Sequence, residues 1–541
     1  MKDFAKNIEE KWVLGDPAKL LYGGNYVYGR FYEEDLDSTF YDGKHAILFF
    51  LTPGGTKIRT GRAYLEKLDD SEIEKLHYWE NLQKKRENYT GLYDNKIVYK
   101  NGSWVKEEFV DFKNDEVEYI EDKNEVNLKF KMKLVPLMKY FGEQSNYNEI
   151  DNTVLSKLIS NTINKLDENY NILNTSITDT INIKLENIKD NNTVENFINT
   201  FLEELRNYYE EHETHITRMF GSYVLLTKEE GILKAIKATP IPIKYCPLMK
   251  KLLTEVGGET AEKLLNTLST EDETNQTKLM CDLINEVVIK GGYFDSNRPL
   301  NSCEANVLFG ASETMSSAFK DNLIDAAVIV SNNLGTIITT NDSNTQGAVK
   351  RMTGLFYTSP SKEIMKTAYE AGIIPVFPHT AEIDQLAGVK KAIDLGYKKI
   401  SVSVAADDNY LHEEISKLEK ENNVVIYKFG LCSTGISEKT ANIMKDNADV
   451  IWSCASKQVK EYVEPNAIAQ VGLKIPVHMM TKQGWEIIKN HLQKMNGDIN
   501  YNEVNLAQAD EKPIFVNDKD KIKLLTKKNI SNCTDCPHPC I

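Results

Sequence analysis

The chain has 541 residues, with 65 lysines and arginines against 80 aspartates and glutamates, so its formal net charge at pH 7 is −15. This acidic balance argues against binding to nucleic acid or to an anionic membrane surface through the overall field of the protein. Hydrophobic residues make up 41% of the chain, and no run approaches the ~20 apolar residues that cross a bilayer. The opening MKDFAKNIEEKW lacks the apolar core of a signal peptide. We therefore expect a cytoplasmic protein.

Residues 1–145 predict a β-rich α+β domain of unknown function. Strand-like runs are broken by Gly-Gly and Pro-Gly-Gly turn signals, the residues around Asn101-Gly102 indicate a hairpin, and Asp70–Arg86 indicates a helix. Residues 146–210 are rich in asparagine, and Leu155, Leu158 and Ile159 recur at helical spacing. We expect this segment to be a helical connector. A homodimer, or a protein partner that binds through residues 1–210, remains open.

Residues 211–500 predict an α/β domain, because strand and helix patterns alternate along most of this segment. Several strands, such as DAAVIVS and ISVSVAA, are continuous apolar runs, which is typical of a parallel sheet covered on both faces. We predict a doubly wound, mainly parallel, Rossmann-like sheet. The run GTIITT is expected to be an antiparallel partner, because only Asn332–Leu334 separate it from the preceding strand.

Small and hydroxyl-bearing residues follow the predicted strands. Ligands of open parallel sheets bind beyond the carboxyl ends of the strands, where helix N-termini offer free N–H groups. Ordinary helix capping explains any single loop equally well, but the set as a whole favours a site for a small anionic ligand. No GxGxxG or GxxxxGK[ST] motif is present. The candidate ligand-binding residues are Gly310, Ser312, Glu313, Asn332, Asn333, Ser433, Thr434, Gly435, Ser456 and Gln470.

Two cysteines, Cys432 and Cys454, occupy equivalent places, each at a strand end just before a helix. A helix N-terminus lowers the pKa of a thiol, and Lys457 adds a positive charge near Cys454. These residues, with Asp384 in an acid–base role, are the candidate catalytic groups. The alternatives are a metal held by both thiols and inert buried cysteines.

The tail, residues 501–541, is polar and ends in the spacing Cys533-x2-Cys536-x3-Cys540. Closely spaced thiols suit Zn²⁺ or an iron–sulfur cluster. We therefore consider these three cysteines candidate metal ligands. A redox-labile or disordered end is the alternative.

From His215 to about Met495 the sequence resembles the methanogenesis marker protein 8 family, a conserved domain of unknown biochemical function. The resemblance is carried by long segments in order, among them HITRMFGSYVLL, FGASETMSSAFKDNLIDAAVIVSNNLGTIITT and STGISEKTANIMKDNADVIWSCASKQVKEYV. It implies a companion of methanogenesis that assists the assembly or activation of methyl-coenzyme M reductase or its nickel tetrapyrrole.

Together these observations suggest an accessory or binding protein of anaerobic metabolism. It would handle a metal cofactor or a small anionic ligand at the carboxyl edge of the α/β sheet. Two alternatives stay open: a thiol-dependent transferase or lyase that uses Cys432 or Cys454, and a structural assembly factor.

Overall fold

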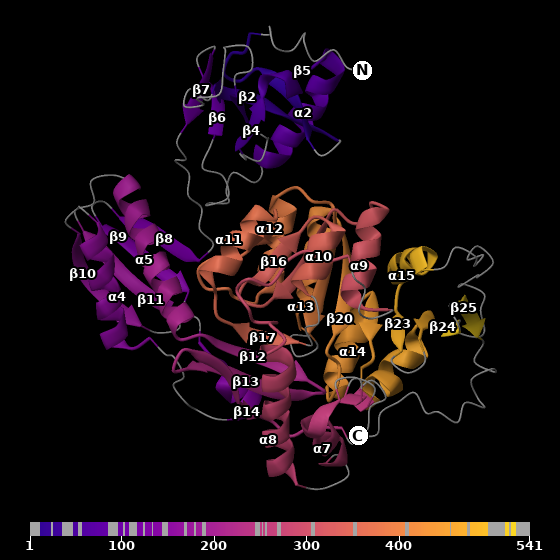
Figure 1. Cartoon of the computed structure of the whole chain (residues 1–541). Coiled ribbons are helices and arrows are strands. Elements are labelled where there is room, and N and C mark those ends of the chain that lie inside the picture. The colour runs from indigo at the N-terminus through magenta and orange to yellow at the C-terminus, as the bar shows by residue number, and fades with distance from the viewer. Residues whose placement is uncertain are drawn as a thin grey trace. The chain divides into compact units, whose positions relative to one another are not determined.

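A computed structural model of the whole chain gives the fold (Figure 1). The chain forms two compact units: residues 1–118 with the short segments 190–195 and 394–396, and the remainder. The structure describes residues 11–22, 25–34, 47–51, 57–84, 96–100, 103–107, 116–122, 125–131, 134–142, 150–166, 170–177, 180–186, 191–243, 249–250, 253–254, 257–267, 272–303, 309–349, 354–405, 410–454, 456–472, 476–495, 514–518 and 521–525.

The first unit contains an antiparallel sheet whose described strands lie in the order β4-β3-β2-β1-β5. Alternate residues such as Leu20, Leu48, Phe50 and Leu65 are buried and form its core. The expected helix is α2 (Asp70–Lys84), and the expected hairpin is the pair β6 (Lys96–Lys100) and β7 (Ser103–Glu107). The sheet strands are β1 (Pro17–Tyr22), β2 (Asn25–Glu34), β3 (Ile47–Leu51), β4 (Lys57–Gly61) and β5 (Leu65–Lys67).

Residues 146–210, expected to be a helical connector, contain two helices and a β-hairpin between them. Helices α4 (Asn152–Lys165) and α5 (Asn191–Glu211) flank a hairpin of β10 (Asn171–Ile177) and β11 (Thr180–Glu186). Strand β11 alternates between buried and half-buried residues and pairs with β9 (Glu125–Lys131), which in turn neighbours β8 (Val117–Asp122). The period of two in TINIKLE is the strand signal, and the helical spacing of the flanking segments obscured it.

A second antiparallel sheet contains strands from distant parts of the chain. Its described strands lie in the order β14 (Ile232–Ala238), β13 (Ser222–Glu229), β12 (Thr214–Met219) and β17 (Leu355–Thr358). Helices α7 (Gly258–Thr267) and α8 (Glu273–Leu283), with the π-helix η2 (Ile284–Ile289), pack their apolar residues against Val224 and Leu226 of β13. We call this sheet the β12 sheet.

The largest sheet, which we call the central sheet, is mixed. Its described strands lie in the order β18-β16-β15-β19-β20-β21-β23-β22-β24-β25. Neighbours β15, β19, β20 and β21 are parallel, as are β22 and β24, whereas the other neighbouring pairs are antiparallel. The strands are β15 (Ala326–Ser331), β16 (Gly335–Thr339), β18 (Ile374–Pro375), β19 (Lys399–Ala405), β20 (Val425–Leu431), β21 (Val450–Trp452), β22 (Ala469–Val471), β23 (Val477–Met479), β24 (Ile514–Asp518) and β25 (Lys521–Leu525).

The predicted doubly wound, mainly parallel, Rossmann-like sheet is therefore wrong, although the unit does mix helices and strands. Strand β16 returns antiparallel to β15, as the short Asn332–Leu334 turn requires. Strand β17 pairs with β12 in the β12 sheet and not with a strand of the central sheet. Strand β23 lies antiparallel between β21 and β22. Apolar runs predict burial on two faces, but they encode neither the direction of a strand nor its neighbour.

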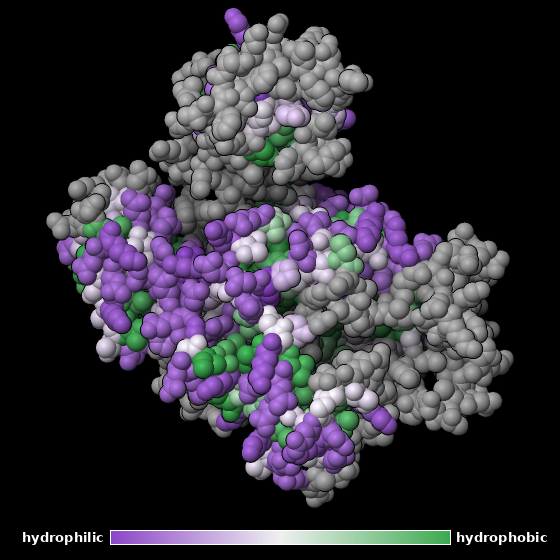
Figure 2. All heavy atoms as spheres, in the orientation of Figure 1, coloured by the Kyte–Doolittle hydropathy of each residue, from purple (hydrophilic) through white to green (hydrophobic). Residues whose placement is uncertain are grey.

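Helices cover both faces of the central sheet. Residues of α9 (Ala311–Lys320), α11 (Lys362–Glu370) and α15 (Lys482–Met495) share one apolar cluster with Phe429 and Val450. Residues of α14 (Glu438–Asn447) pack with Ile451, whose side chain points the opposite way from Val450. Figure 2 shows hydrophilic side chains over much of the helical surface, with small apolar groups among them. None of the described helices has both the length and the apolar composition needed to cross a membrane.

Candidate functional site

The parallel strands β15, β19, β20 and β21 place their carboxyl ends at one edge of the central sheet. The turn Asn332–Asn333 follows β15, and the loop Cys432–Gly435 follows β20. The Ser433 hydroxyl donates to the carbonyls of Trp452 and Ser453, at 2.7 and 2.6 Å, so the loops after β20 and β21 touch. The Trp452 indole donates to the carbonyl of Phe309 at 2.7 Å. We call the carboxyl end of these strands the carboxyl edge.

Several residues at the carboxyl edge have left-handed backbone. Asn333, Cys432 and Cys454 have φ values of 60°, 56° and 46°, and Ala381 has 52°. Ala381 belongs to this edge because its carbonyl lies against Gly335, the first residue of β16. A non-glycine residue in this conformation costs on the order of 1–3 kcal/mol, and such strain concentrates at functional sites.

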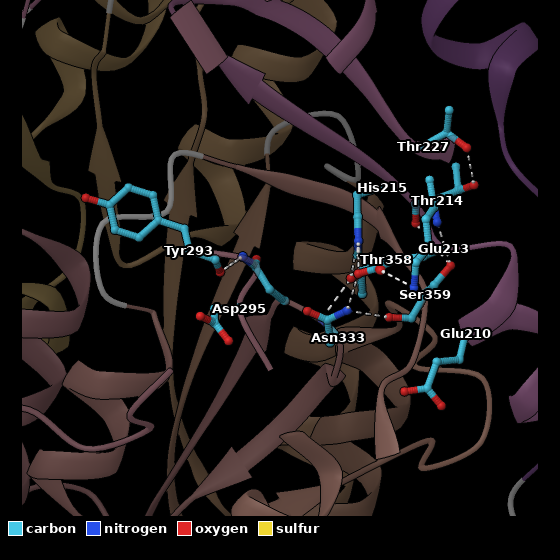
Figure 3. Close-up of polar contacts among 12 residues, drawn as sticks. Glu210, Glu213, Thr214, His215, Thr227, Tyr293, Asp295, Asn333, Thr358 and Ser359 are labelled. Atoms are coloured by element: carbon cyan, nitrogen blue, oxygen red, sulfur yellow. Dashed lines mark hydrogen bonds and ion pairs between the residues drawn. The ribbon is translucent and has the colours of Figure 1, made fainter. Parts of the chain in front are cut away.

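A buried polar network joins the Asn332–Asn333 turn to the β12 sheet (Figure 3). The His215 ring lies 2.8 Å from Thr358 Oγ1 through Nδ1 and 3.0 Å from Glu213 Oε1 through Nε2. The Asn333 amide donates from its backbone to Thr358 Oγ1 at 2.8 Å and from Nδ2 to Glu213 Oε1 at 3.1 Å. The Ser359 carbonyl accepts a second bond from Asn333 Nδ2 at 3.3 Å. The network therefore holds the turn after β15 through both the backbone and the side chain of Asn333.

The Thr358, His215 and Glu213 contacts have the order of a hydroxyl–imidazole–carboxylate triad. However, Thr358 and His215 are both 0% exposed and pair with each other in neighbouring strands. Both side chains are already used in contacts within the network, and we assign the network a positioning role.

Glu213 is the charged member of the network. Burial raises the pKa of its carboxyl, but the hydrogen bonds from His215 and Asn333 and the charges of His215 and Lys228 outweigh burial and lower the pKa to about 2. Glu213 is thus a carboxylate at neutral pH.

Arg298 lies beside the same turn. Its guanidinium donates to the Asn332 carbonyl and, at 3.4 Å, to both the Ser331 hydroxyl and the Asp295 carbonyl. Burial lowers its pKa to about 10, opposed by the attraction of Asp295 and Glu213. Arg298 is half-buried, and in the described part of the chain no carboxylate lies within ion-pair distance of it, so its positive charge at the carboxyl edge is balanced only by the more distant charges of Asp295 and Glu213.

A second arginine holds the loop after β20. Arg218 of β12 donates to the carbonyls of Cys432, at 2.7 Å, and of Thr434. Its guanidinium also stacks over the Tyr223 ring at 4.9 Å. Because a guanidinium is planar and presents several donors, this single side chain ties the β12 sheet to the Cys432–Gly435 loop.

Comparison with known proteins assigns the sequence of this chain to a family. Residues 215–493 match the DUF2099 family, described as an uncharacterized protein conserved in archaea. An uncharacterized protein of Methanocaldococcus jannaschii is 35% identical over 281 residues, which are 51% of this chain and 89% of that relative. The chain belongs to this archaeal family. No solved structure matches the chain.

The family match encloses most of the site. Arg218, Arg298, Asn333 and Cys432 lie within residues 215–493, whereas Glu213 precedes them. The match takes in 89% of the archaeal relative, so residues 1–214 have no counterpart of comparable length there. Neither description mentions methanogenesis. The comparisons therefore show membership of an uncharacterized archaeal family, and they do not confirm the expected methanogenesis marker protein 8 family.

The expected thiols do reach the carboxyl edge. Cys432 and Cys454 are both half-buried and form no disulfide with another described cysteine. They pack into different apolar clusters, Cys432 beside Tyr223 and Phe356 and Cys454 beside the residues of α9 and α15. The residues expected to assist the thiols, Lys457 and Asp384, have other contacts. Lys457 is exposed and lies 3.7 Å from Glu461, and Asp384 accepts from the Ala387 amide as the cap of α12 (Gln385–Asp394).

Most of the other expected ligand-binding residues have hydrogen-bond partners within the protein. Gly310 precedes α9, where the Ser312 hydroxyl donates to Glu313 and Glu313 accepts from Gln346. Thr434 offers its carbonyl to Arg218, Gly435 has φ of 72° in the same loop, Ser456 accepts from the Val459 amide, and Gln470 donates to the Gly472 carbonyl.

The candidate metal ligands Cys533, Cys536 and Cys540 lie outside the described residues. Within the residues that the structure does describe, no group of three or more His, Cys, Asp or Glu side chains is arranged to hold a metal ion. The tail metal site stays a prediction.

Sequence reasoning missed Glu213, His215, Arg218, Arg298 and Thr358. One signal was present in THITRM, where polar residues occupy both faces of a strand that is buried along nearly all of its length. Buried polar groups need partners, so a strand of this composition indicates a polar network. The identity of the partners depends on the fold.

Proposed function

We propose that this protein binds a small anionic molecule at the carboxyl edge, beside the Asn332–Asn333 turn. The observation that carries the proposal is Arg298, a half-buried guanidinium that has no carboxylate within ion-pair distance among the described residues. An unpaired charge removed from water is costly, so such groups are normally paired in the functional state. A carboxylate or phosphate matches the fork of guanidinium donors.

The surroundings of Arg298 support the same function. The turn that it contacts is held in left-handed backbone by the network of Glu213, His215 and Thr358. A site that is fixed before its ligand arrives loses less free energy on ordering. We further propose that the protein acts as an accessory of anaerobic, methanogenesis-linked metabolism. The support for this setting is the methanogen relative.

The test is a binding screen on the full chain with inorganic phosphate and small mono- and dicarboxylates. We expect at least one of these anions to raise the unfolding temperature and to bind in calorimetry, more weakly at higher salt. Arg298→Met should weaken that binding about tenfold or more, and Arg298→Lys should retain part of it. Arg206→Met is the matched control, because Arg206 lies on α5 within 3.9 Å of Glu203. Binding by Arg298→Met at wild-type strength contradicts the proposal, as does a screen in which no anion binds.

Thiol chemistry is a second candidate function, because two half-buried cysteines follow neighbouring strands at this edge in left-handed backbone. Alkylation by iodoacetamide, followed residue by residue in mass spectrometry, tests it. A reactive thiolate at Cys432 or Cys454 should react faster than the exposed Cys303, the control. If both cysteines react more slowly than Cys303, the thiol-enzyme candidate is excluded.

A further inference from the structure

The side-chain amide of Asn333 has a fixed orientation. Its Nδ2 faces Glu213 Oε1 at 3.1 Å and the Ser359 carbonyl at 3.3 Å. Both neighbours are acceptors only, since a carboxylate and a carbonyl carry no hydrogen to donate. Rotating the amide by 180° would place its oxygen against two other oxygens, so only one orientation is stable. Figure 3 shows the nitrogen turned toward Ser359 and Glu213 and the oxygen turned away from them.

The oxygen of this amide is left without a partner. Asn333 is 1% exposed, and within the described structure its Oδ1 is buried and accepts no hydrogen bond. A buried acceptor without a donor costs about 1–3 kcal/mol, so an orphan of this kind in a native protein indicates a missing partner. The three bonds that hold the residue keep Oδ1 from turning to find a donor elsewhere.

The orphaned oxygen belongs to the turn that Arg298 contacts. Arg298 donates to the carbonyl of Asn332, the residue directly before Asn333. The carbonyl that Arg298 contacts and the orphaned oxygen therefore lie at consecutive residues of the chain, and the inference takes one small molecule to meet both Arg298 and Asn333 Oδ1. The partner that Arg298 lacks is negative, and the partner that Asn333 Oδ1 lacks is an O–H or N–H donor.

We infer that Asn333 determines specificity: the ligand carries a hydrogen-bond donor next to its anionic group, as an α-hydroxy acid or an α-amino acid does. This inference rests on the proposed function, because it assumes that an anion binds at Arg298. It adds the class of the ligand, and it assigns recognition of the donor to Asn333 Oδ1.

Two matched sets of probes test the inference on the wild-type full chain. Succinate, malate and aspartate differ only in a hydrogen, a hydroxyl or an ammonium at one carbon, and propionate, lactate and alanine differ in the same way. We expect calorimetry to show that the hydroxyl or the ammonium member of a set binds at least about tenfold more tightly than the member without a donor. The two donor-bearing arms distinguish a hydroxy acid from an amino acid.

Asn333→Gly then tests the residue. Glycine tolerates the left-handed backbone at this position, so the turn is retained while the amide oxygen is removed. The ratio between donor-bearing and donor-free probes should fall to near one. Asn423→Gly is the matched control, because Asn423 is exposed, has φ of 50° and precedes β20 at the opposite edge of the sheet. It should leave the ratio unchanged.

The outcomes separate this inference from the proposed function. If wild-type protein binds donor-free and donor-bearing probes equally, the inference is overturned and anion binding stands. If the preference survives in Asn333→Gly, a residue other than Asn333 reads the donor and the inference is again overturned. If neither set binds, this inference is overturned, and the phosphate arm of the binding screen still decides the proposed function. The comparison in wild-type protein remains decisive even if Asn333→Gly does not fold.

Discussion

Glu213 and His215 stand two residues apart at the start of β12, and a 3.0 Å contact joins Glu213 Oε1 to His215 Nε2. The same carboxylate oxygen accepts from Asn333, which lies at the end of a strand of the central sheet. One carboxylate therefore links the β12 sheet to the turn that we propose as the ligand site. Loss of the Glu213 charge should therefore weaken the contacts of both the β12 sheet and the Asn332–Asn333 turn.

Glu213→Gln should destabilise the protein in a pH-dependent way. The pKa of Glu213 is lowered from 4.5 to about 2 in the fold, so the ionised form adds stability above about pH 4.5. That contribution disappears as the pH falls through about 2. We expect Glu213→Gln to lose on the order of 3 kcal/mol of unfolding free energy at pH 7, with the difference from wild type shrinking toward pH 2. Urea denaturation at a series of pH values measures this. Glu229→Gln, at an exposed position on β13, should show no such trend.

His412→Leu should stabilise the protein in mild acid. His412 of α13 (Tyr410–Asn422) is fully buried, and in the described structure neither ring nitrogen has a partner. Burial, with a smaller effect from the charge of Lys428, lowers its pKa from 6.5 to about 3. Between pH 6.5 and 3 the unfolded chain therefore binds a proton at His412 and the folded chain does not. As the pH is lowered through this interval, the unfolding free energy of the wild type falls by about 1.4 kcal/mol per pH unit.

His412→Leu removes this titration and should flatten the stability curve over that interval. The segment from pH 6.5 to 5 separates this effect from that of Glu213, which begins lower. His77→Leu, at an exposed position on α2, is the control. A variant curve that runs parallel to wild type would show that His412 is already protonated in the fold.

Gly335→Ala and Gly372→Ala form a matched pair at left-handed positions, with φ of 64° and 73°. A Cβ at Gly335 would lie 2.2 Å from the carbonyl oxygen of Ala381, whereas a Cβ at Gly372 meets nothing within 4 Å. We expect Gly372→Ala to cost only the backbone strain, about 1 kcal/mol. Gly335→Ala should cost at least about 2 kcal/mol more, because two backbone segments must separate. Equal denaturation midpoints for the two variants would contradict the close approach at the carboxyl edge.

Lys428→Met should be among the most destabilising substitutions in the central sheet. The buried Lys428 ammonium lies 2.6 Å from Glu419 and 3.2 Å from Asp449, whose side chain is 4% exposed. Removing the lysine leaves a buried carboxylate unpaired, which typically costs 3–5 kcal/mol. Lys417→Met on α13 is the control, because Lys417 is exposed and its pairs with Glu413 and Glu414 are worth at most about 1 kcal/mol. Chemical denaturation of both variants measures the two losses of unfolding free energy, and equal losses would contradict the prediction that the buried lysine matters more.

The amino-acid sequence by itself determined the local structure of much of this protein. The helix at Asp70–Lys84, the hairpin around residues 101–102 and the antiparallel return of GTIITT follow from periodicity and turn residues, which act over a few positions. The candidates Asn332 and Asn333 were found for the same reason, because they directly follow an apolar strand. Hairpin β10–β11 shows the limit of such patterns, since its flanking helices concealed a strand period of two.

Only the tertiary structure decided which strands are neighbours and which side chains complete the site. His215 meets Thr358 across 143 positions of the chain, and Arg218 meets Cys432 across 214. A periodic pattern states that a face is buried, but it does not state what buries it. Partners at these separations are chosen by the packing of whole sheets and by the need of each buried polar group for a partner. The direction of β23, the pairing of β17 with β12 and the position of Arg298 therefore arise from the assembled fold.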